Sequence, residues 1–361
     1  MGAKRSGRGS SMKTVVTTMR NEAPFVLEWV AHQRVLGFDG ILAFSNDCAD
    51  GTDAMLDRLQ QLGVLAHVPN PRRGTKPVQW TALRRAENHP YVKKADWVMV
   101  ADVDEFLNIH AGAGRLDDLI AARPEARAFL LAWRMFGSGG TVAFRDEPVT
   151  GQFLRAAPDT LVWPWRAVQF KTLFRNDIPG TRLGVHKPHP PKDMPEGAWV
   201  DDTGNPVPRV MGTVLPKVVR RYALAQVNHY ALGSVESFVV KSDRGKPNHL
   251  DQGIGLEYWL DRDFDECEDR SILRHAPALR AEMDALLADP ELARLHRAGV
   301  EWRRRRFAEL MLRSESFYLH ARILRHLSGG RMDMAAQLAM LQGLYRMRQA
   351  ETARRAGDQP A

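Results

Sequence analysis

A chain of 361 residues exceeds one average domain, and its 44% hydrophobic and 26% charged residues are typical of a globular protein with a sizeable core. Its formal net charge of +8 favours an anionic partner, which nucleic acid, an acidic membrane face or a phosphorylated small molecule would each provide. No apolar run approaches the ~20 residues of a membrane span or forms a signal peptide, so we expect a cytoplasmic protein. The two cysteines, Cys48 and Cys267, are too few and too far apart for a disulfide scaffold or a zinc site, which predicts free thiols.

Strand-like and helical patterns alternate along the first hundred residues. Residues 23–37 predict an amphipathic helix, because Trp29 and Leu36 lie seven apart, Pro24 suits a first turn and Gly37 suits a helix end. Short β-branched or apolar runs predict buried strands on either side. The expected strands are 12–19, 40–46, 64–70 and 96–101, and the further helices are 50–63 and 77–89.

Alternation of this kind implies parallel strands joined by right-handed crossovers. Ligands of such sheets bind at the carboxyl ends of the strands. Polar and charged residues gather at all four of these ends, so we expect the functional site there. The segments concerned are 17–22, 45–51, 70–76 and 102–105.

The rest of the chain changes character twice. Residues from about 125 to 230 are strand-like and rich in Pro and Trp, which predicts mixed sheet with long loops. From about 270 the chain is helical and basic, with its densest charge run at 303–307. The expected organisation is a disordered basic tail at 1–12, an α/β domain at 13–265 with halves at 13–110 and 111–265, and a helical extension at 266–361.

Three carboxylates follow the fourth expected strand within four positions, at Asp102, Asp104 and Glu105. In an extended segment alternate side chains share a face, so Asp102 and Asp104 would point one way and Val103 the other. Two carboxylates on one side make a half-site for Mg²⁺ or Mn²⁺, which would add water and phosphate oxygens. The alternative is a turn or helix cap formed by Asp104 and Glu105.

The other strand ends carry weaker signals for a nucleotide. Asp47 would accept hydrogen bonds from a base or ribose, although a plain turn with a helix cap also explains it, and Asn21 and Glu22 carry the same ambiguity. Basic residues near these ends would meet phosphate, although solvated loop charges are commoner. They are Arg20, Arg72, Arg73 and Lys76.

Taken together, these motifs resemble a bacterial subgroup of family 2 type glycosyltransferases with the GT-A fold. The subgroup has N-E, E-W, H and G, then N-D-x-x-x-D-G-T, D-x-D-E-F, and a later N-H-Y segment. The matching residues are Asn21-Glu22, Glu28-Trp29, His32, Gly37, 46–52, 102–106 and 227–245, and the last hundred or so residues match nothing. The resemblance implies a Rossmann-like α/β fold, with a mixed, mainly parallel central sheet flanked by helices, followed by the helical extension.

The same resemblance implies metal-dependent transfer of a sugar from a UDP- or GDP-sugar to a hydroxyl of a saccharide, lipid or protein acceptor, usually with inversion. The first half of the domain would bind the nucleotide and the second half the acceptor. Carried over by position, Glu22 and Asp47 would contact the nucleoside, and Asp102 and Asp104 would hold the ribose and the metal. Arg20, Asn21 and Lys76 would join this donor site.

Later residues complete the expected site. His229 is the candidate for a further ligand of Mn²⁺ or Mg²⁺, the alternative being a hydrogen-bonded core histidine. Lys171, Lys241 and Arg244 would steady the leaving diphosphate. A general base must deprotonate the acceptor. The family's usual E-D motif has no clean counterpart here, so the candidates are Asp146, Glu147 and His186.

Three other functions compete with glycosyl transfer. A non-catalytic relative that still binds nucleotide would keep the same motifs. A basic nucleic-acid-binding protein would explain the charge, but no groove-reading fold is recognisable. Metal-dependent phosphoryl transfer would use the same acids, but the chain lacks a P-loop of G-x-x-x-x-G-K-[ST] type. We expect no nucleic-acid partner and a role in cell-surface polysaccharide or glycolipid synthesis, with peripheral contact at the inner membrane face left open.

Overall fold

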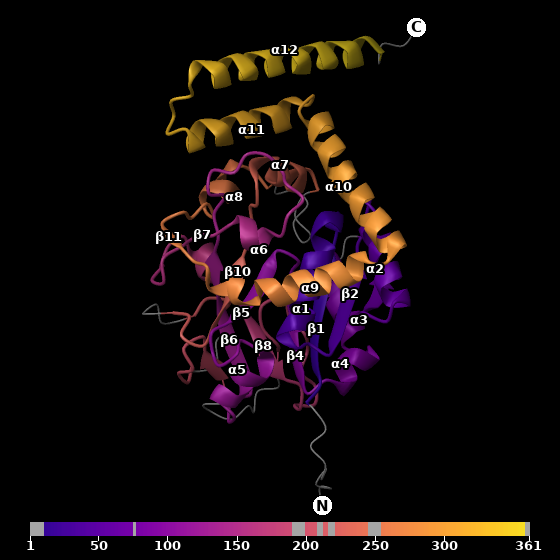
Figure 1. The fold of residues 1–361 in the computed structure, drawn as a ribbon, viewed down its shortest axis with the longest axis vertical. Coiled ribbons are helices and arrows are strands. Elements are labelled where there is room, and N and C mark those ends of the chain that lie inside the picture. The colour runs from indigo at the N-terminus through magenta and orange to yellow at the C-terminus, as the bar shows by residue number, and fades with distance from the viewer. Residues whose placement is uncertain are drawn as a thin grey trace, which may run out of the picture.

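The computed structural model describes residues 11–74, 77–189, 199–207, 212–215, 221–244 and 254–357. Figure 1 shows an α/β body with two long helices stacked at one end. The strands are β1 (Lys13–Met19), β2 (Gly40–Ser45), β3 (Ala66–Pro69), β4 (Trp97–Val100), β5 (Glu105–Ile109), β6 (Ala128–Met135), β7 (Arg155–Ala156), β8 (Phe170–Arg175), β9 (Trp199–Asp201), β10 (Ala225–His229) and β11 (Cys267–Glu268). The α-helices are α1 (Val26–Leu36), α2 (Thr52–Gln61), α3 (Val78–Ala86), α4 (Pro90–Lys94), α5 (Leu116–Ala122), α6 (Val149–Gln152), α7 (Val235–Asp243), α8 (Leu256–Leu260), α9 (Ala276–Leu287), α10 (Pro290–Leu310), α11 (Ser314–Leu327) and α12 (Met334–Gly357). The 3₁₀ helices are η1 (Ala23–Phe25), η2 (Trp165–Val168) and η3 (Ser271–His275).

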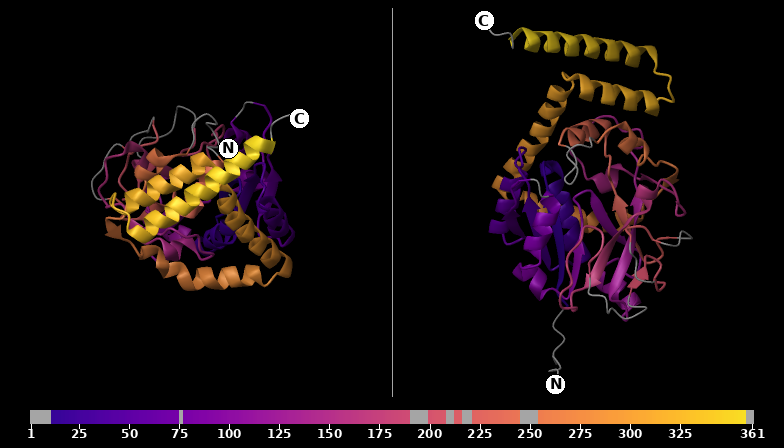
Figure 2. Two further views of the ribbon diagram at one scale, coloured as in Figure 1. Left: turned by 90° about the horizontal axis from the view of Figure 1, so that it is seen from above. Right: turned by 180° about the vertical axis from the view of Figure 1, so that it is seen from behind.

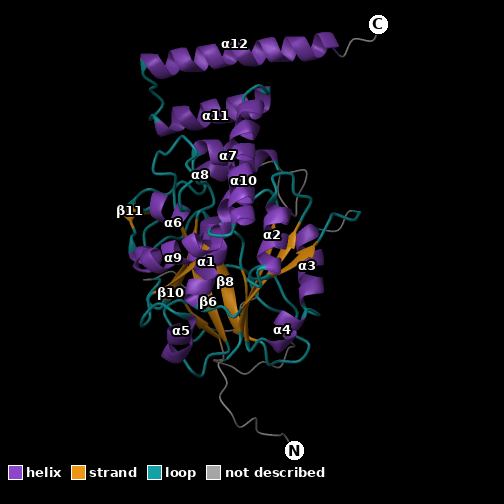
Figure 3. Ribbon diagram, turned by 45° about the vertical axis from the view of Figure 1, so that its right-hand side comes forward, coloured by secondary structure: helices purple, strands orange, loops and turns teal. Residues whose placement is uncertain are grey.

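A mixed sheet forms the centre of the body. Its strand order is β3-β2-β1-β4-β8-β6-β10-β5, with β9 beside β6. The first four strands run parallel, whereas β8 is antiparallel to β4 and β6, and β5 is antiparallel to β10. Helices flank this sheet and continue into the C-terminal region (Figure 3). The expected fold class is therefore confirmed.

The expected N-terminal elements are confirmed to within a few residues. Strands β1 and β2 are buried on almost every side chain, as parallel strands covered on both faces are. Two expectations further along are wrong. Residues 165–168, within the stretch expected to be strand-like, form the 3₁₀ helix η2. Strand β5 was not among the expected strands, and it begins directly after the acidic segment.

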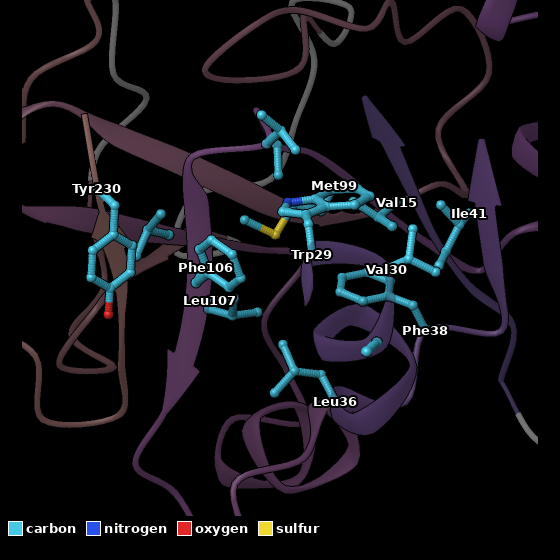
Figure 4. Close-up of a cluster of buried hydrophobic side chains, with 14 of the residues drawn as sticks. Val15, Trp29, Val30, Leu36, Phe38, Ile41, Met99, Phe106, Leu107 and Tyr230 are labelled. Carbon is cyan, nitrogen blue, oxygen red and sulfur yellow. The ribbon is translucent and has the colours of Figure 1, made fainter. Parts of the chain in front are cut away.

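Helix α1 anchors the first half of the body to the sheet. It ends at Gly37, whose φ of 96° is left-handed and favours glycine. Figure 4 shows Trp29 and Val30 of α1 in the same apolar cluster as Met99 of β4, and burial of each such side chain stabilises the fold by roughly 1.5–3 kcal/mol. Trp29 Nε1 also donates to the carbonyl oxygen of Glu105 at 3.2 Å, which ties α1 to the segment that carries the acids.

The C-terminal region begins on the body and ends away from it. Strand β11 pairs with β7, α9 packs against α1, and α10 packs against η1, α2 and α7. Helix α11 packs on α7 and α8, and α12 packs on α11, so that α12 lies at the end of the molecule (Figure 1, and the right view of Figure 2). None of the described helices is both long enough and apolar enough to cross a bilayer. A domain boundary near residue 266 stays a prediction. The residues just after it, in β11, pair with β7 of the α/β body.

Candidate functional site at the carboxyl end of β4

The acidic segment after β4 lies in a turn rather than in an extended strand. The Glu105 amide donates to the carbonyl oxygen of Asp102 at 3.1 Å, and β5 starts at that residue. Because the turn redirects the chain to pair with β10, residues 102–104 lose the alternation of an extended segment. The prediction that Asp102 and Asp104 share one face assumed an extended segment, and that assumption is wrong. The two carboxylates contact different basic residues.

Asp102 is neutralised by a lysine from β8. Lys171 Nζ lies 3.0 Å from Asp102 Oδ2 and 3.1 Å from Glu105 Oε2, while Gln79 Nε2 donates to Asp102 Oδ1 at 3.1 Å. Burial would lower the pKa of Lys171, but the two carboxylates outweigh it and raise that pKa. Burial raises the pKa of Glu105 to about 8. Lys171 thus neutralises the Asp102 carboxylate and also contacts Glu105, whose raised pKa favours the protonated acid.

Asp104 has a lysine of its own, from α7. Lys241 Nζ donates to Asp104 Oδ2 at 2.6 Å and to the carbonyl oxygen of Ala231 at 2.7 Å. His229 Nε2 lies 3.7 Å from Asp104 Oδ1. Burial alone would raise the pKa of Asp104, but Lys241 and His229 hold it well below its usual range. Burial lowers the pKa of His229, which favours a neutral imidazole beside an ionised carboxylate.

The end of β1 contributes a second ion pair close by. Arg244, just after α7, pairs with Glu22 and donates to the carbonyl oxygen of Arg20, and Arg20 in turn donates to the carbonyl oxygen of Arg244. Burial raises the pKa of Glu22, although Arg244 and Lys241 oppose that rise. Residues that are 224 positions apart in the chain thus meet at the sheet edge.

Two of the expected nucleoside contacts are turn residues in this structure. Asn21 Oδ1 accepts from the Ala49 amide at 2.8 Å, and Asp47 Oδ2 accepts from the Arg72 amide at 3.0 Å. Both have positive φ, 56° and 45°, a conformation more common for Asn and Asp than for other non-glycine residues. These bonds match the alternative of a plain turn. Lys76 lies outside the described residues.

A pocket opens beside Asp104. Its wall comes from η1, the 144–153 segment, the 230–244 segment and α10. The charged side chains at its edge carry both signs, while aromatic rings cover much of the remainder. The charged ones are Glu22, Asp104, Arg145, Lys241, Arg244 and Arg303, and the aromatic ones are Phe25, Phe144, Phe153 and Tyr230.

Arg303 is a pocket residue that the sequence did not indicate. It belongs to the 303–307 charge run, but it is 5% exposed. Its guanidinium lies 4.7 Å from the centre of the Phe25 ring and donates to the carbonyl oxygen of Ser237 at 2.9 Å. Burial lowers its pKa to about 10. The sequence offered a weak signal at most, namely that Arg303 lies three residues after Val300, on the buried side of α10.

The three base candidates lie in different places. Asp146 Oδ1 is 3.0 Å from His296 Nε2, and Glu147 lines a separate hollow against α9. Neither lines the pocket beside Asp104. His186 Nδ1 lies 3.0 Å from the carbonyl oxygen of Phe170, and burial lowers its pKa to about 4. Among the three, His186 is the one whose titration depends on Lys171 and Asp102.

The residues expected to hold a divalent cation assemble in part. Asp104 and His229 lie together, but Asp102 and Asp104 each contact a lysine. Across the described ranges, no three His, Cys, Asp or Glu side chains form a group suited to a metal ion. Mg²⁺ in phosphate-transfer sites commonly takes one or two carboxylates and draws its other ligands from water and the substrate. The residues therefore fit a cation that enters with a diphosphate better than a resident one.

Comparison with known proteins places this site in context. Residues 14–149 match the family model described as glycosyltransferase family 92, so the match begins in β1 and includes the turn at 102–104. Over these residues the chain resembles a glycosyltransferase. It is therefore a transferase enzyme. No curated protein matches it by sequence.

Solved structures give weaker likenesses. S. aureus TarS matches with 15% identity and a TM-score of 0.29, over 46% of this chain and 28% of that one. TarS 1–349 in complex with UDP-GlcNAc matches with 14% identity and a TM-score of 0.28, over 46% of this chain and 45% of that one. The chain thus spans less than half the length of these proteins, and TM-scores this low carry no argument about its fold or substrate.

Proposed function

We propose that this transferase uses a nucleoside diphosphate sugar as donor and transfers the sugar to an acceptor hydroxyl in the pocket beside Asp104. The observation that supports this most is the position of Asp104. It follows β4 at the carboxyl edge of the parallel strands, where α/β sheets bind ligands, and it borders the pocket. The matched stretch 14–149 contains it.

The charges at the pocket suit a diphosphate leaving group. When the nucleoside diphosphate departs, negative charge develops on its terminal phosphate, and fixed positive groups lower the energy of that state. Lys241, Arg244 and Arg303 supply three such groups at the pocket wall. Asp104 pairs with Lys241 and Glu22 pairs with Arg244, which orients these two basic side chains.

A divalent cation is part of the proposal as a companion of the donor. Such an ion would neutralise diphosphate charge and polarise the leaving oxygen. Asp104 is the carboxylate best prepared to hold it, because its pKa is held low and it stays ionised. His229, with a neutral imidazole 3.7 Å away, is the nearest second ligand.

The finer assignments are proposals of the same kind. A family 2 type mechanism on a GT-A fold, with inversion and with the 13–110 half binding the nucleotide, would explain the motif order along the chain. A UDP- or GDP-sugar donor and a cell-envelope acceptor would suit the basic charge. His186 is the base candidate closest to the acids by its electrostatic coupling to Asp102.

Turnover measurements test the proposal. UDP- and GDP-sugars are incubated with Mn²⁺ and a panel of saccharide and lipid acceptors, and release of nucleoside diphosphate is followed. Asp104→Asn is expected to lower release at least ~100-fold, because it removes the ionised carboxylate from the donor site. Asp284→Asn, exposed on α9, serves as the matched control and should retain the activity of the unmodified chain. Equal turnover by Asp104→Asn and the control would contradict the proposal.

A further inference from the structure

Helix α12 exposes a row of large apolar side chains. Met334, Leu338, Leu341 and Tyr345 are 67%, 52%, 45% and 59% exposed. Their spacing of four, three and four residues places them along one face of the helix. Contiguous exposed apolar faces of this kind mark surfaces that another body covers.

The opposite face of α12 packs on α11. Met347 is 1% exposed, and it lies two residues, or about 200° around the helix, from Tyr345. Gly343 approaches Phe317 of α11 so closely that an added Cβ would lie 2.9 Å from the ring. The apolar row therefore faces away from α11, on the outermost side of the molecule (Figures 1 and 2).

Positive charge surrounds this apolar row. Residues 314–357, which hold α11, α12 and their connection, contain seven arginines and three carboxylates. Arg322, Arg325, Arg346 and Arg348 are exposed. A helix with an apolar face, flanking arginines and too little apolar length to span a bilayer is suited to lie in a membrane interface.

We propose that the α11–α12 hairpin docks this face on an anionic lipid bilayer. Charge decides between the two available occupants. A second copy would bring the same excess of arginines against the first and repel it, whereas acidic headgroups complement those arginines. Helices α12 and α11 would then lie between the lipid surface and α7, which carries the pocket residues Ser237 and Lys241.

Vesicle flotation with the full chain tests the proposal. Vesicles of phosphatidylcholine alone are compared with vesicles in which a third of the lipid is phosphatidylglycerol. The chain should float with the anionic vesicles at low salt and dissociate as salt rises. Leu338→Gln with Leu341→Gln should weaken that binding at least ~10-fold, since it removes apolar insertion. Arg346→Gln with Arg348→Gln should weaken it roughly 10- to 30-fold on anionic vesicles.

A matched control separates docking from general loss of apolar surface. Leu62→Gln with Val162→Gln exchanges two other exposed apolar residues, 41% and 65% exposed, and should bind like the unmodified chain. Far-UV circular dichroism verifies that each variant keeps its helices, since glutamine is a good helix former. Equal binding by the α12 variants and the control overturns the proposal. So does sedimentation that shows a dimer which the leucine variant splits while lipid binding is absent.

Discussion

The protonation of Glu105 gives a quantitative prediction about how the stability of the protein depends on pH. Its side chain is fully buried, it shares Lys171 with Asp102, and its Oε1 has no hydrogen-bond partner among the described residues. Burial raises its pKa to about 8 from an ordinary 4.5. An acid whose pKa is raised on folding contributes most to the stability of the folded state at pH values below its unfolded pKa. That contribution is lost as the pH rises through its folded pKa.

Glu105→Gln removes this titration while keeping the shape of the side chain. At 1.36 kcal/mol per pH step, the unmodified chain should lose about 4 kcal/mol relative to Glu105→Gln between about pH 5 and about pH 8. Urea denaturation followed by tryptophan fluorescence at several pH values measures the difference in free energy of unfolding. Glu309→Gln, 57% exposed, is the control and should track the unmodified chain. Parallel curves for Glu105→Gln and the unmodified chain would mean that Glu105 is ionised beside Lys171, and would refute the reasoning.

Three further predictions concern the same acids. Lys171→Met should lower the free energy of unfolding by roughly 1–3 kcal/mol, because it leaves the Asp102 carboxylate without its cation and the buried Glu105 without a hydrogen-bond donor; a urea midpoint shift worth under ~0.5 kcal/mol would contradict this. Lys241→Gln should weaken donor binding at least ~10-fold, and unchanged donor affinity of the folded variant would remove the lysine from the site. EDTA should abolish sugar transfer and Mn²⁺ should restore it, whereas full turnover in EDTA would exclude the proposed cation.

The sequence predicted those parts of the fold that depend on local pattern. Apart from α4, the elements from β1 to β4 were predictable because their apolar spacing and their Pro and Gly boundaries are local signals. The start of β5 was not, because the acids ahead of it indicated a loop. The start of β8 was not predictable either, because η2 just before it also contains aromatic and β-branched residues.

The candidate site was predictable in its position but not in its contacts. The carboxyl ends of parallel strands gather Glu22, Asp102 and Asp104 as expected. The partners of the two aspartates come from residues 69 and 137 positions further along the chain, Lys171 and Lys241, and no local pattern encodes that pairing. Fold topology alone brings them together, so the motif could not indicate that each aspartate has a lysine partner.

Calorimetric titration of the donor tests the central claim most directly. UDP, GDP and their sugars are titrated with Mn²⁺ into the unmodified chain, Asp104→Asn and Asp284→Asn. We predict that one nucleotide series binds the unmodified chain and the Asp284 variant equally and binds Asp104→Asn at least ~10-fold more weakly. Equal binding to all three proteins, or no binding of either series to the unmodified chain, would contradict a donor site at the turn after β4.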